Sequence, residues 1–196
     1  RGVTQEAARL MVRTEPTVIA ALALKRGEAD AMICGLEGRF ANHLRHVKLI
    51  IGPRPGVSDR DLSTLSMLIT QNRIIFLTDT YVTIDPAPEE IAEMTVLAAE
   101  EIRRFGMEPR AALLSLSDFG SRDAPSTLKM RRAADILKRV APDLQCDGEM
   151  HADTALSETL RQRVYPHSRL KGEANLLVFP TLDAANITLT AVKQMM

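Results

Sequence analysis

Short apolar runs alternate with longer amphipathic stretches along most of the chain, and this alternation restricts the possible fold more than any other feature. Four of the runs have the length and composition of buried strands: residues 74–77, 111–116, 144–146 and 174–179. The stretches between them have the periodicity of single helices. Strands joined by single helices need parallel, right-handed crossovers. The sequence therefore predicts an α/β fold with a doubly wound parallel sheet and helices on both faces.

Start and stop signals divide this pattern further. Helices are expected from about Thr4, after Pro16, from Pro88 to Gly106, over 125–140, from Asp153 and from Asp183. Residues 29–34 read as another buried strand. A cluster of chain breakers follows at 52–56, so we expect residues 1–57 to form part of a first α/β lobe and residues 58–196 a second lobe. The first and last residues suggest a fragment whose parent chain extends further.

The composition limits the classes of partner. The 25 basic and 25 acidic residues give no net charge that would hold nucleic acid or a membrane surface. Cys34 and Cys146 stand apart in apolar surroundings, which predicts buried, reduced thiols and no zinc site. The apolar runs are too short to cross a bilayer. We therefore expect a cytoplasmic protein with no nucleic-acid partner, no membrane partner and no metal of its own.

Ligands of parallel sheets bind beyond the carboxyl ends of the strands, and one polar turn lies at such a position. Ser117, Gly120 and Ser121 follow the run 111–116. Exposed amides of this turn, together with Arg122, could cradle a phosphate group. The alternative is an ordinary turn between a strand and a helix.

Two further segments are rich in chemical groups. Residues 147–153 contain three carboxylates, including those of Asp147 and Asp153, and one imidazole, and these groups would suit acid–base catalysis. The alternative is that Asp147 forms a turn and Asp153 caps a helix. Metal binding by His151 and Asp153 is not expected. The segment after Cys34 gathers basic groups that suit phosphate oxygens, or else form a solvated face: Arg39, Arg45, His46 and Arg54.

Several segments, in the right order, resemble the phosphotransacetylase family. Residues 27–35 are similar to its "GEADG…SG" segment, and further similar segments are 55–58, 105–110, 147–149, 171–175 and 179–182. The resemblance implies two α/β lobes with a cleft, an architecture shared with isocitrate and isopropylmalate dehydrogenases. It also implies acetyl transfer between coenzyme A and phosphate without a metal or a covalent intermediate. Arg45 falls where the family keeps an arginine for the acyl phosphate.

Residues 37–45 and 117–121 look more like the phosphotransacetylase-like domain fused behind the catalytic domain of bacterial NADP-dependent malic enzymes. This subgroup implies a degenerate acyltransferase that binds acetyl-CoA and regulates oxidative decarboxylation of malate. It implies a homo-oligomer, with NADP and a divalent metal bound only by the malic enzyme catalytic domain elsewhere in the parent chain. The expected acetyl-CoA or phosphate contacts are Arg45, Arg39, Ser117, Gly120, Ser121, Asp147 and Asp153.

Two other functions remain open at this stage. An active phosphate acetyltransferase would use a carboxylate to deprotonate coenzyme A, with Arg45 and a second arginine stabilising the developing charge. The family's serine-arginine-glycine-cysteine segment and catalytic aspartate would then lie beyond Met196. A dehydrogenase is disfavoured because the sequence has no recognisable nicotinamide signature or aspartate triad, and a shared fold does not carry function.

Overall fold

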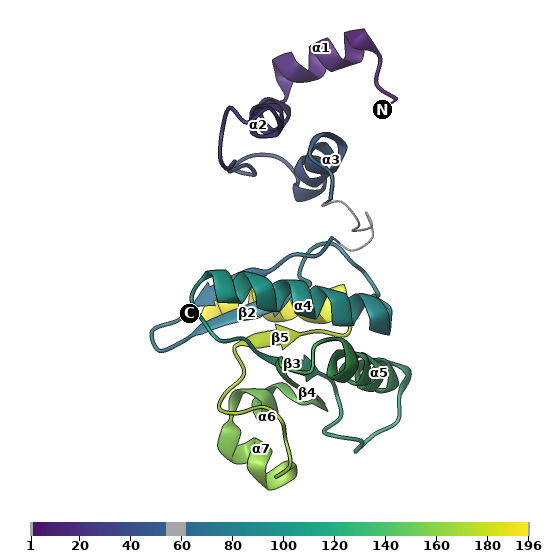
Figure 1. The fold of residues 1–196 in the computed structure, drawn as a ribbon, viewed down its shortest axis with the longest axis vertical. Helices are drawn as coiled ribbons and strands as arrows, with labels where there is room; N and C mark the ends of the chain where they lie inside the picture. The colour runs from purple at the N-terminus through teal and green to yellow at the C-terminus, as the bar shows by residue number, and fades with distance from the viewer. Residues whose placement is uncertain (1, 54–61, 196) are drawn as a thin grey trace. The chain divides into compact units, whose positions relative to one another are not determined.

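The computed structural model describes residues 2–53 and 62–195, and the chain divides into two compact units, residues 1–60 and 61–196 (Figure 1). Each unit is described by itself. The assignment of the two segments to lobes of a larger fold stays a prediction. Arg54 and the segment 55–58, which carried part of the sequence argument, lie outside the described residues.

The described residues of the first unit form three helices, α1 (Gln5–Thr14), α2 (Pro16–Lys25) and α3 (Phe40–Ile50). Thr4 caps α1 by accepting a hydrogen bond from the Ala7 amide at 3.2 Å, and Pro16 opens α2. Both helix starts are as predicted. A small core of Val18, Ala21 and Ile50 holds α2 against α3.

Residues 29–34 are not a strand, so this prediction is wrong. The side chain of Ile33 is 99% exposed, and Cys34, expected to be buried, is exposed as well. A strand needs a neighbour for its backbone hydrogen bonds, and the described part of this unit contains only helices. The apolar run alone therefore did not determine the local structure.

The second unit is built on a five-stranded sheet. In spatial order the strands are β1 (Ser66–Ile69), β2 (Ile74–Thr78), β5 (Leu176–Val178), β3 (Arg110–Leu114) and β4 (Gln145–Met150). The last four are parallel, as predicted, whereas the edge strand β1 is antiparallel to β2 and was not predicted. The sheet is therefore mixed and mostly parallel.

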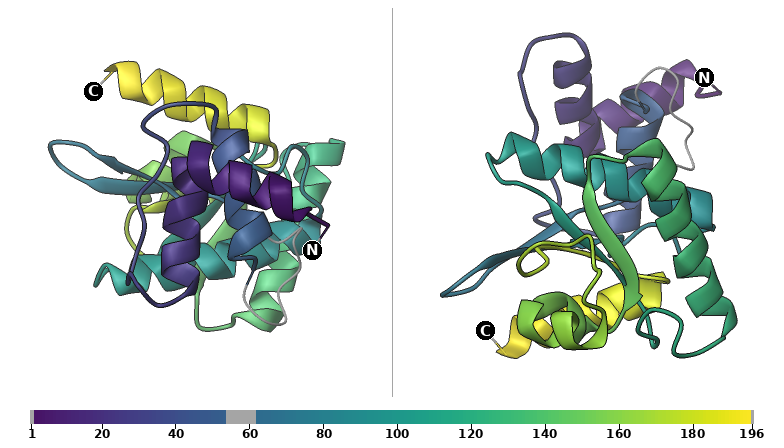
Figure 2. Two further views of the ribbon diagram at one scale, coloured as in Figure 1. Left: turned by 90° about the horizontal axis from the view of Figure 1, so that it is seen from above. Right: turned by 60° about the horizontal axis from the view of Figure 1, so that its bottom comes forward.

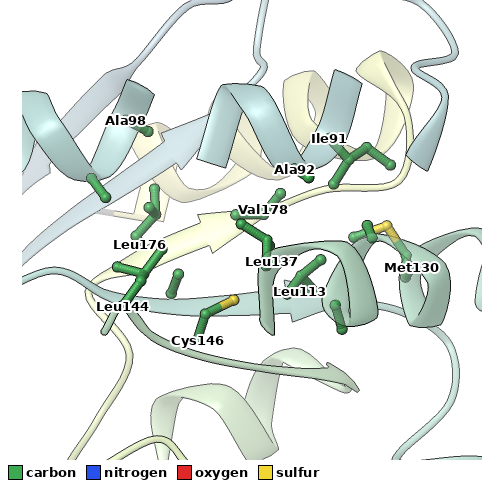
Figure 3. Close-up of a cluster of buried hydrophobic side chains, with 14 of the residues drawn as sticks. Ile91, Ala92, Ala98, Leu113, Met130, Leu137, Leu144, Cys146, Leu176 and Val178 are labelled. Atoms are coloured by element: carbon green, nitrogen blue, oxygen red, sulfur yellow. The ribbon is translucent and has the colours of Figure 1, made fainter. Parts of the chain in front are cut away.

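Helices cover both faces of this sheet, as the sequence predicted (Figures 1 and 2). One face packs against α4 (Pro88–Arg104) and α5 (Pro125–Val140), and Figure 3 shows the apolar cluster between them and the strands. The other face packs against α6 (Ala152–Leu156) and α8 (Leu182–Met195), while α7 (Glu158–Val164) follows α6. The helix over 125–140 has the predicted bounds.

Neighbouring residues of one strand serve the two faces. In β3, Ala111 and Leu113 belong to the cluster under α4 and α5, while Ala112 and Leu114 belong to the cluster on the opposite face. A strand covered on both faces has no polar side, which explains its continuous apolar sequence. Each fully buried leucine contributes roughly 1.5–3 kcal/mol to stability. The carboxyl ends of β3 and β4 lead into polar segments.

Candidate functional site

The carboxyl ends of β3 and β4 lie side by side, and both lead into polar segments. After β3 the chain passes through residues 115–124 before α5 begins at Pro125. After β4 it passes through His151, the N-cap residue of α6. Parallel pairing of the two strands brings these two sequence-predicted segments to the same edge of the sheet.

The carboxylate of Glu149 organises the turn after β3. Its side chain is 1% exposed, and Oε1 accepts hydrogen bonds from Ser117 Oγ at 2.8 Å and from the Gly120 amide at 2.9 Å. Arg131 of α5 places its Nε 3.0 Å from each carboxylate oxygen. A buried carboxylate with this many donors is fully satisfied. The turn is therefore folded around an anion that the protein itself supplies.

The backbone amides of the turn are used within the protein. The five N–H groups of residues 118–122 donate to Ser121 Oγ, the Glu149 carbonyl, Glu149 Oε1, the Asp118 carbonyl and Ser117 Oγ. These amides are bonded to Glu149 and to groups of the turn itself, and the expectation that exposed amides of this turn cradle a phosphate stays a prediction. Ligand contact by Ser117, Gly120 or Ser121 stays a prediction, although Ser117 is fully buried.

Arg131 braces the turn from α5. Besides Glu149 it contacts Asp123 Oδ1 at 2.9 Å and the Arg122 carbonyl at 2.6 Å. Hydrogen bonds with Glu149 and Asp123 raise the pKa of the Arg131 guanidinium above its ordinary value. The Arg131 guanidinium therefore stays charged at any physiological pH. Sequence reasoning missed Arg131 because it lies in the middle of a regular amphipathic helix, with no local signal of its task.

Asp118 and His151 form a second pair at this edge. Asp118 Oδ1 accepts the His151 amide at 2.8 Å, and Oδ2 lies 3.0 Å from His151 Nδ1. The side chain of His151 is 45% exposed and that of Asp118 is 15% exposed. The carboxylate thus fixes both the backbone and the ring of the histidine, and the ring faces solvent in part.

Asp147 and Asp153 differ in their surroundings. Asp147 is buried; Oδ2 accepts hydrogen bonds from Ser168 Oγ at 2.9 Å and the Arg169 amide at 2.7 Å, which ties β4 to the connection before β5. Asp153 is exposed in the first turn of α6 and accepts the Thr154 amide at 2.8 Å. Ligand contact by either residue stays a prediction, and the bonds of Asp147 are those of a structural residue.

The predicted basic residues of the first unit lie on α3. Arg39 is its N-cap and Arg45 lies one and a half turns along; both side chains are exposed and have no hydrogen-bond or ion-pair partner within residues 2–53. His46, in contrast, is 4% exposed, with Nε2 3.7 Å from Glu15 Oε2. The exposed arginines are available to an anionic ligand, and the buried histidine is part of the packing of α3 on α2.

The described residues contain neither a cluster of metal ligands nor a membrane-spanning helix. Within residues 2–53 and 62–195 no group of three His, Cys, Asp or Glu side chains is placed to hold a metal ion. Over the same residues, every helix is too short or too polar to cross a membrane. The groups that the edge of the sheet offers are one imidazole held by a carboxylate and the exposed side chain of Arg122.

Comparison with known proteins adds an independent line of evidence. The whole chain, residues 1–196, matches the family model described as "Phosphate acetyl/butaryl transferase". An NAD-dependent malic enzyme of Rhizobium meliloti is 64% identical over 194 residues, covering 99% of this chain and 25% of the relative. The NADP-dependent malic enzyme of Escherichia coli is 50% identical over 188 residues, covering 96% of this chain and 24% of the relative.

A solved structure agrees with the sequence relatives. A phosphotransacetylase from Streptococcus pyogenes superposes with a TM-score of 0.87 at 32% sequence identity, covering 98% of this chain and 58% of that chain. The chain spans about a quarter of the length of the malic enzymes that it matches. Both the predicted fold class and the predicted resemblance are therefore confirmed.

Proposed function

Because the chain belongs to the phosphate acetyl/butyryl transferase family, we propose that it is the phosphotransacetylase-like domain of a malic enzyme and binds acetyl-CoA as an allosteric regulator of malate oxidative decarboxylation. The observation that carries the proposal is the match of nearly the whole chain to a quarter of two malic enzymes at 64% and 50% identity. The catalytic domain, with its nicotinamide coenzyme and divalent metal, then belongs to the rest of the parent chain. The two relatives are named for different coenzymes, so an assay should include both NAD and NADP.

The exposed arginines of α3 support the choice of an anionic ligand. The guanidinium group offers paired donors that match phosphate oxygens, and acetyl-CoA carries several phosphate groups. Arg45 is the leading candidate because it is exposed on a regular helix and lacks an acidic partner within the described residues. Arg39, at the start of the same helix, is the second candidate.

Regulation would work through the relative population of two arrangements of the parent protein. A ligand shifts such an equilibrium only by the difference between its affinities for the two states. Typical couplings of about 1–3 kcal/mol change an apparent affinity roughly 5- to 150-fold. Acetyl-CoA binding at this domain can therefore change malate turnover several-fold without any contact with malate.

The proposed protein is a homo-oligomer in which this domain takes part in subunit contacts. An apolar surface in the second unit supports this: Met67, Ile69 and Ile74 share one face of the β1–β2 hairpin, and Phe105 packs on the nearby Phe76. Met67, Ile69, Ile74 and Phe105 are each more than a third exposed, whereas Phe76 is buried. Contiguous exposed apolar side chains of this kind are typical of interaction surfaces.

An active phosphate acetyltransferase is the second candidate, favoured by the likeness to a solved phosphotransacetylase over 98% of this chain. In that reaction the acetyl group of acetyl-CoA passes to inorganic phosphate, and free coenzyme A leaves. The nucleophile is a phosphate oxygen and the leaving group is the thiolate, which takes up a proton. The two candidates differ in whether acetyl phosphate accumulates.

The test is malate-dependent formation of NADH and NADPH by the full-length parent protein, with acetyl-CoA titrated and coenzyme A as the ligand control. We expect a saturable response to acetyl-CoA, and we expect Arg45→Ala to raise the half-saturating concentration by about tenfold, the loss of one charged hydrogen bond. Arg13→Ala, an exposed arginine of α1, is the matched control. An unchanged response in Arg45→Ala removes Arg45 from the site. A rate of malate turnover that does not depend on acetyl-CoA, together with formation of acetyl phosphate, supports the transferase instead.

A further inference from the structure

The Asp118–His151 pair has the geometry of an oriented imidazole. Two contacts to one carboxylate, at 2.8 Å from the backbone amide and at 3.0 Å from Nδ1, fix the ring as well as its attachment point. Since Nδ1 is bound by Asp118, Nε2 is the ring nitrogen that a ligand can reach.

The turn that carries Asp118 is held in place from two directions. Glu149 binds it from inside the protein through Ser117 Oγ, the Gly120 amide and the Phe119 amide. On the other side the ring of Phe119 stacks on Tyr165, with centroids 4.2 Å apart and planes 16° apart. The position of Asp118, and so of the His151 ring, is therefore set before any ligand arrives.

Packing does not explain the imidazole. The His151 side chain is 45% exposed, and it gives no side-chain hydrogen bond to cap α6. The ring lies at the carboxyl end of β4, next to the end of β3, which is the edge where parallel sheets bind their ligands. Because the amides of residues 118–122 are already bonded, an anion at this edge must be bound by side chains.

We infer that His151, oriented by Asp118, is a ligand-contacting residue whose protonated ring donates Nε2–H to a phosphate oxygen. This rests on the proposed function, because it names the recognition chemistry of the same domain. Arg122 belongs to the same turn, is exposed and has no acidic partner within the described residues, so it adds a second cation to this edge. The phosphate oxygen belongs either to the nucleotide part of acetyl-CoA or to inorganic phosphate. Asp118 acts as a positioning residue.

Histidine is the side chain whose charge changes most readily near neutral pH, so pH is the variable that tests the proposed contact. The charged group against the ring is Asp118 of the β3–α5 turn, and Asp153 lies one residue further into α6 with Oδ1 on the Thr154 amide. A protonated imidazole donates from both ring nitrogens, so we expect the proposed contact to be stronger at low pH than at high pH. His151→Gln keeps an N–H donor but does not titrate, whereas His151→Ala loses both properties.

The experiment measures binding of acetyl-CoA, and separately of inorganic phosphate, to the full-length parent protein by titration calorimetry between pH 6 and 8.5. We expect His151→Ala to weaken binding about tenfold at pH 6 and less than twofold at pH 8.5. His151→Gln and Asp118→Asn should flatten the pH profile relative to the wild type. His167→Gln, an exposed histidine without a carboxylate partner within residues 62–195, is the matched control and should follow the wild type.

The two probes identify the source of the phosphate. A change confined to acetyl-CoA assigns the contact to its nucleotide part, and a change for inorganic phosphate assigns it to the free anion. Parallel pH profiles for the wild type and His151→Ala, with both probes, overturn the inference; so does a wild type that binds neither probe. Binding that depends on His151 but leaves malate turnover unchanged supports the inference and removes only the regulatory function.

Discussion

Replacing Glu149 by glutamine should loosen the turn after β3 while leaving the sheet intact. Glutamine has nearly the same shape but no charge, and its amide nitrogen cannot accept a hydrogen bond. The carboxylate now accepts from Ser117 Oγ, the Gly120 amide and Arg131 Nε. In the variant the glutamine side-chain carbonyl oxygen can still accept some of these hydrogen bonds. Hydrogen bonds to a charged group are worth about 1.5–3 kcal/mol each, and neutral ones about 1 kcal/mol.

The expected net loss is therefore about 2 kcal/mol, which corresponds to roughly a 30-fold rise in the population of the opened turn. Amide hydrogen exchange of residues 118–122 measures this opening directly, even in a multidomain protein, because each N–H bond of the turn reports its own opening. The exchange rates of these amides should rise about 30-fold, while those of Ala112 and Leu113 in β3 should change little.

Asp123→Asn is the matched control for this prediction. Asp123 contacts the same arginine at 2.9 Å, but its side chain is 78% exposed, and exposed ion pairs contribute little. We expect less than a threefold change in exchange for this variant. Equal effects of the two substitutions, or unchanged exchange in Glu149→Gln, would refute the reasoning that a buried carboxylate holds the turn.

Two further predictions concern β4. Gly148→Ala should destabilise the β3–β4 pair by about 3 kcal/mol, because a Cβ would lie 2.7 Å from the Leu113 carbonyl oxygen and φ is +141°. The control Gly106→Ala, at φ +74° in open space, should cost only about 1 kcal/mol. Hydrogen exchange of the β3 amides measures the difference, and comparable exchange rates in the two variants would contradict the prediction. Burial raises the pKa of the Cys146 thiol, so the folded chain keeps this proton above about pH 8.5, where an unfolded chain releases it. The free energy of unfolding should therefore fall with rising alkaline pH by up to about 1.4 kcal/mol per pH unit. In urea unfolding, Cys146→Ala should lack this contribution to the pH dependence of stability.

The elements that sequence predicted best are those determined by local signals. Pro125 at the first helical turn and a regular apolar face fixed both ends of α5, and the apolar runs located β2 to β5 because both faces of these strands are covered. Edge strand β1 was missed because it is only four residues long and has one covered face. Residues 29–34 also contain an apolar run, but a strand forms only where another strand is available for pairing, and the local sequence does not show whether one is.

The site was predictable in place but not in chemistry. The turn after β3 and the segment after β4 were both expected at the carboxyl edge, since the rule for parallel sheets needs only the order of elements. The filling of the turn by Glu149, 29 residues after Gly120, is a long-range contact with no local pattern. The same holds for the pairing of Asp118 with His151, 33 residues apart.

A comparable arrangement at the end of β2 bears on the choice between regulator and transferase. The buried Asp79 carboxylate accepts hydrogen bonds from the amides of Thr64, Tyr81, Val82 and Thr83, at 2.7–3.2 Å, and from Thr64 Oγ1 at 2.6 Å. Asp79 thus binds four loop amides at the end of β2, whereas Glu149 binds the Gly120 amide through its carboxylate and the Phe119 amide through its carbonyl. Catalysis of acyl transfer relies on preorganised donors kept for the charge that develops in the transition state. In the described part of this edge the amides of residues 118–122 are bound to carboxylate, carbonyl and hydroxyl oxygens of the chain itself, whereas the cationic side chain of Arg122 is exposed. We therefore expect this edge to bind an anion rather than to stabilise a transition state, in line with the proposed regulatory function.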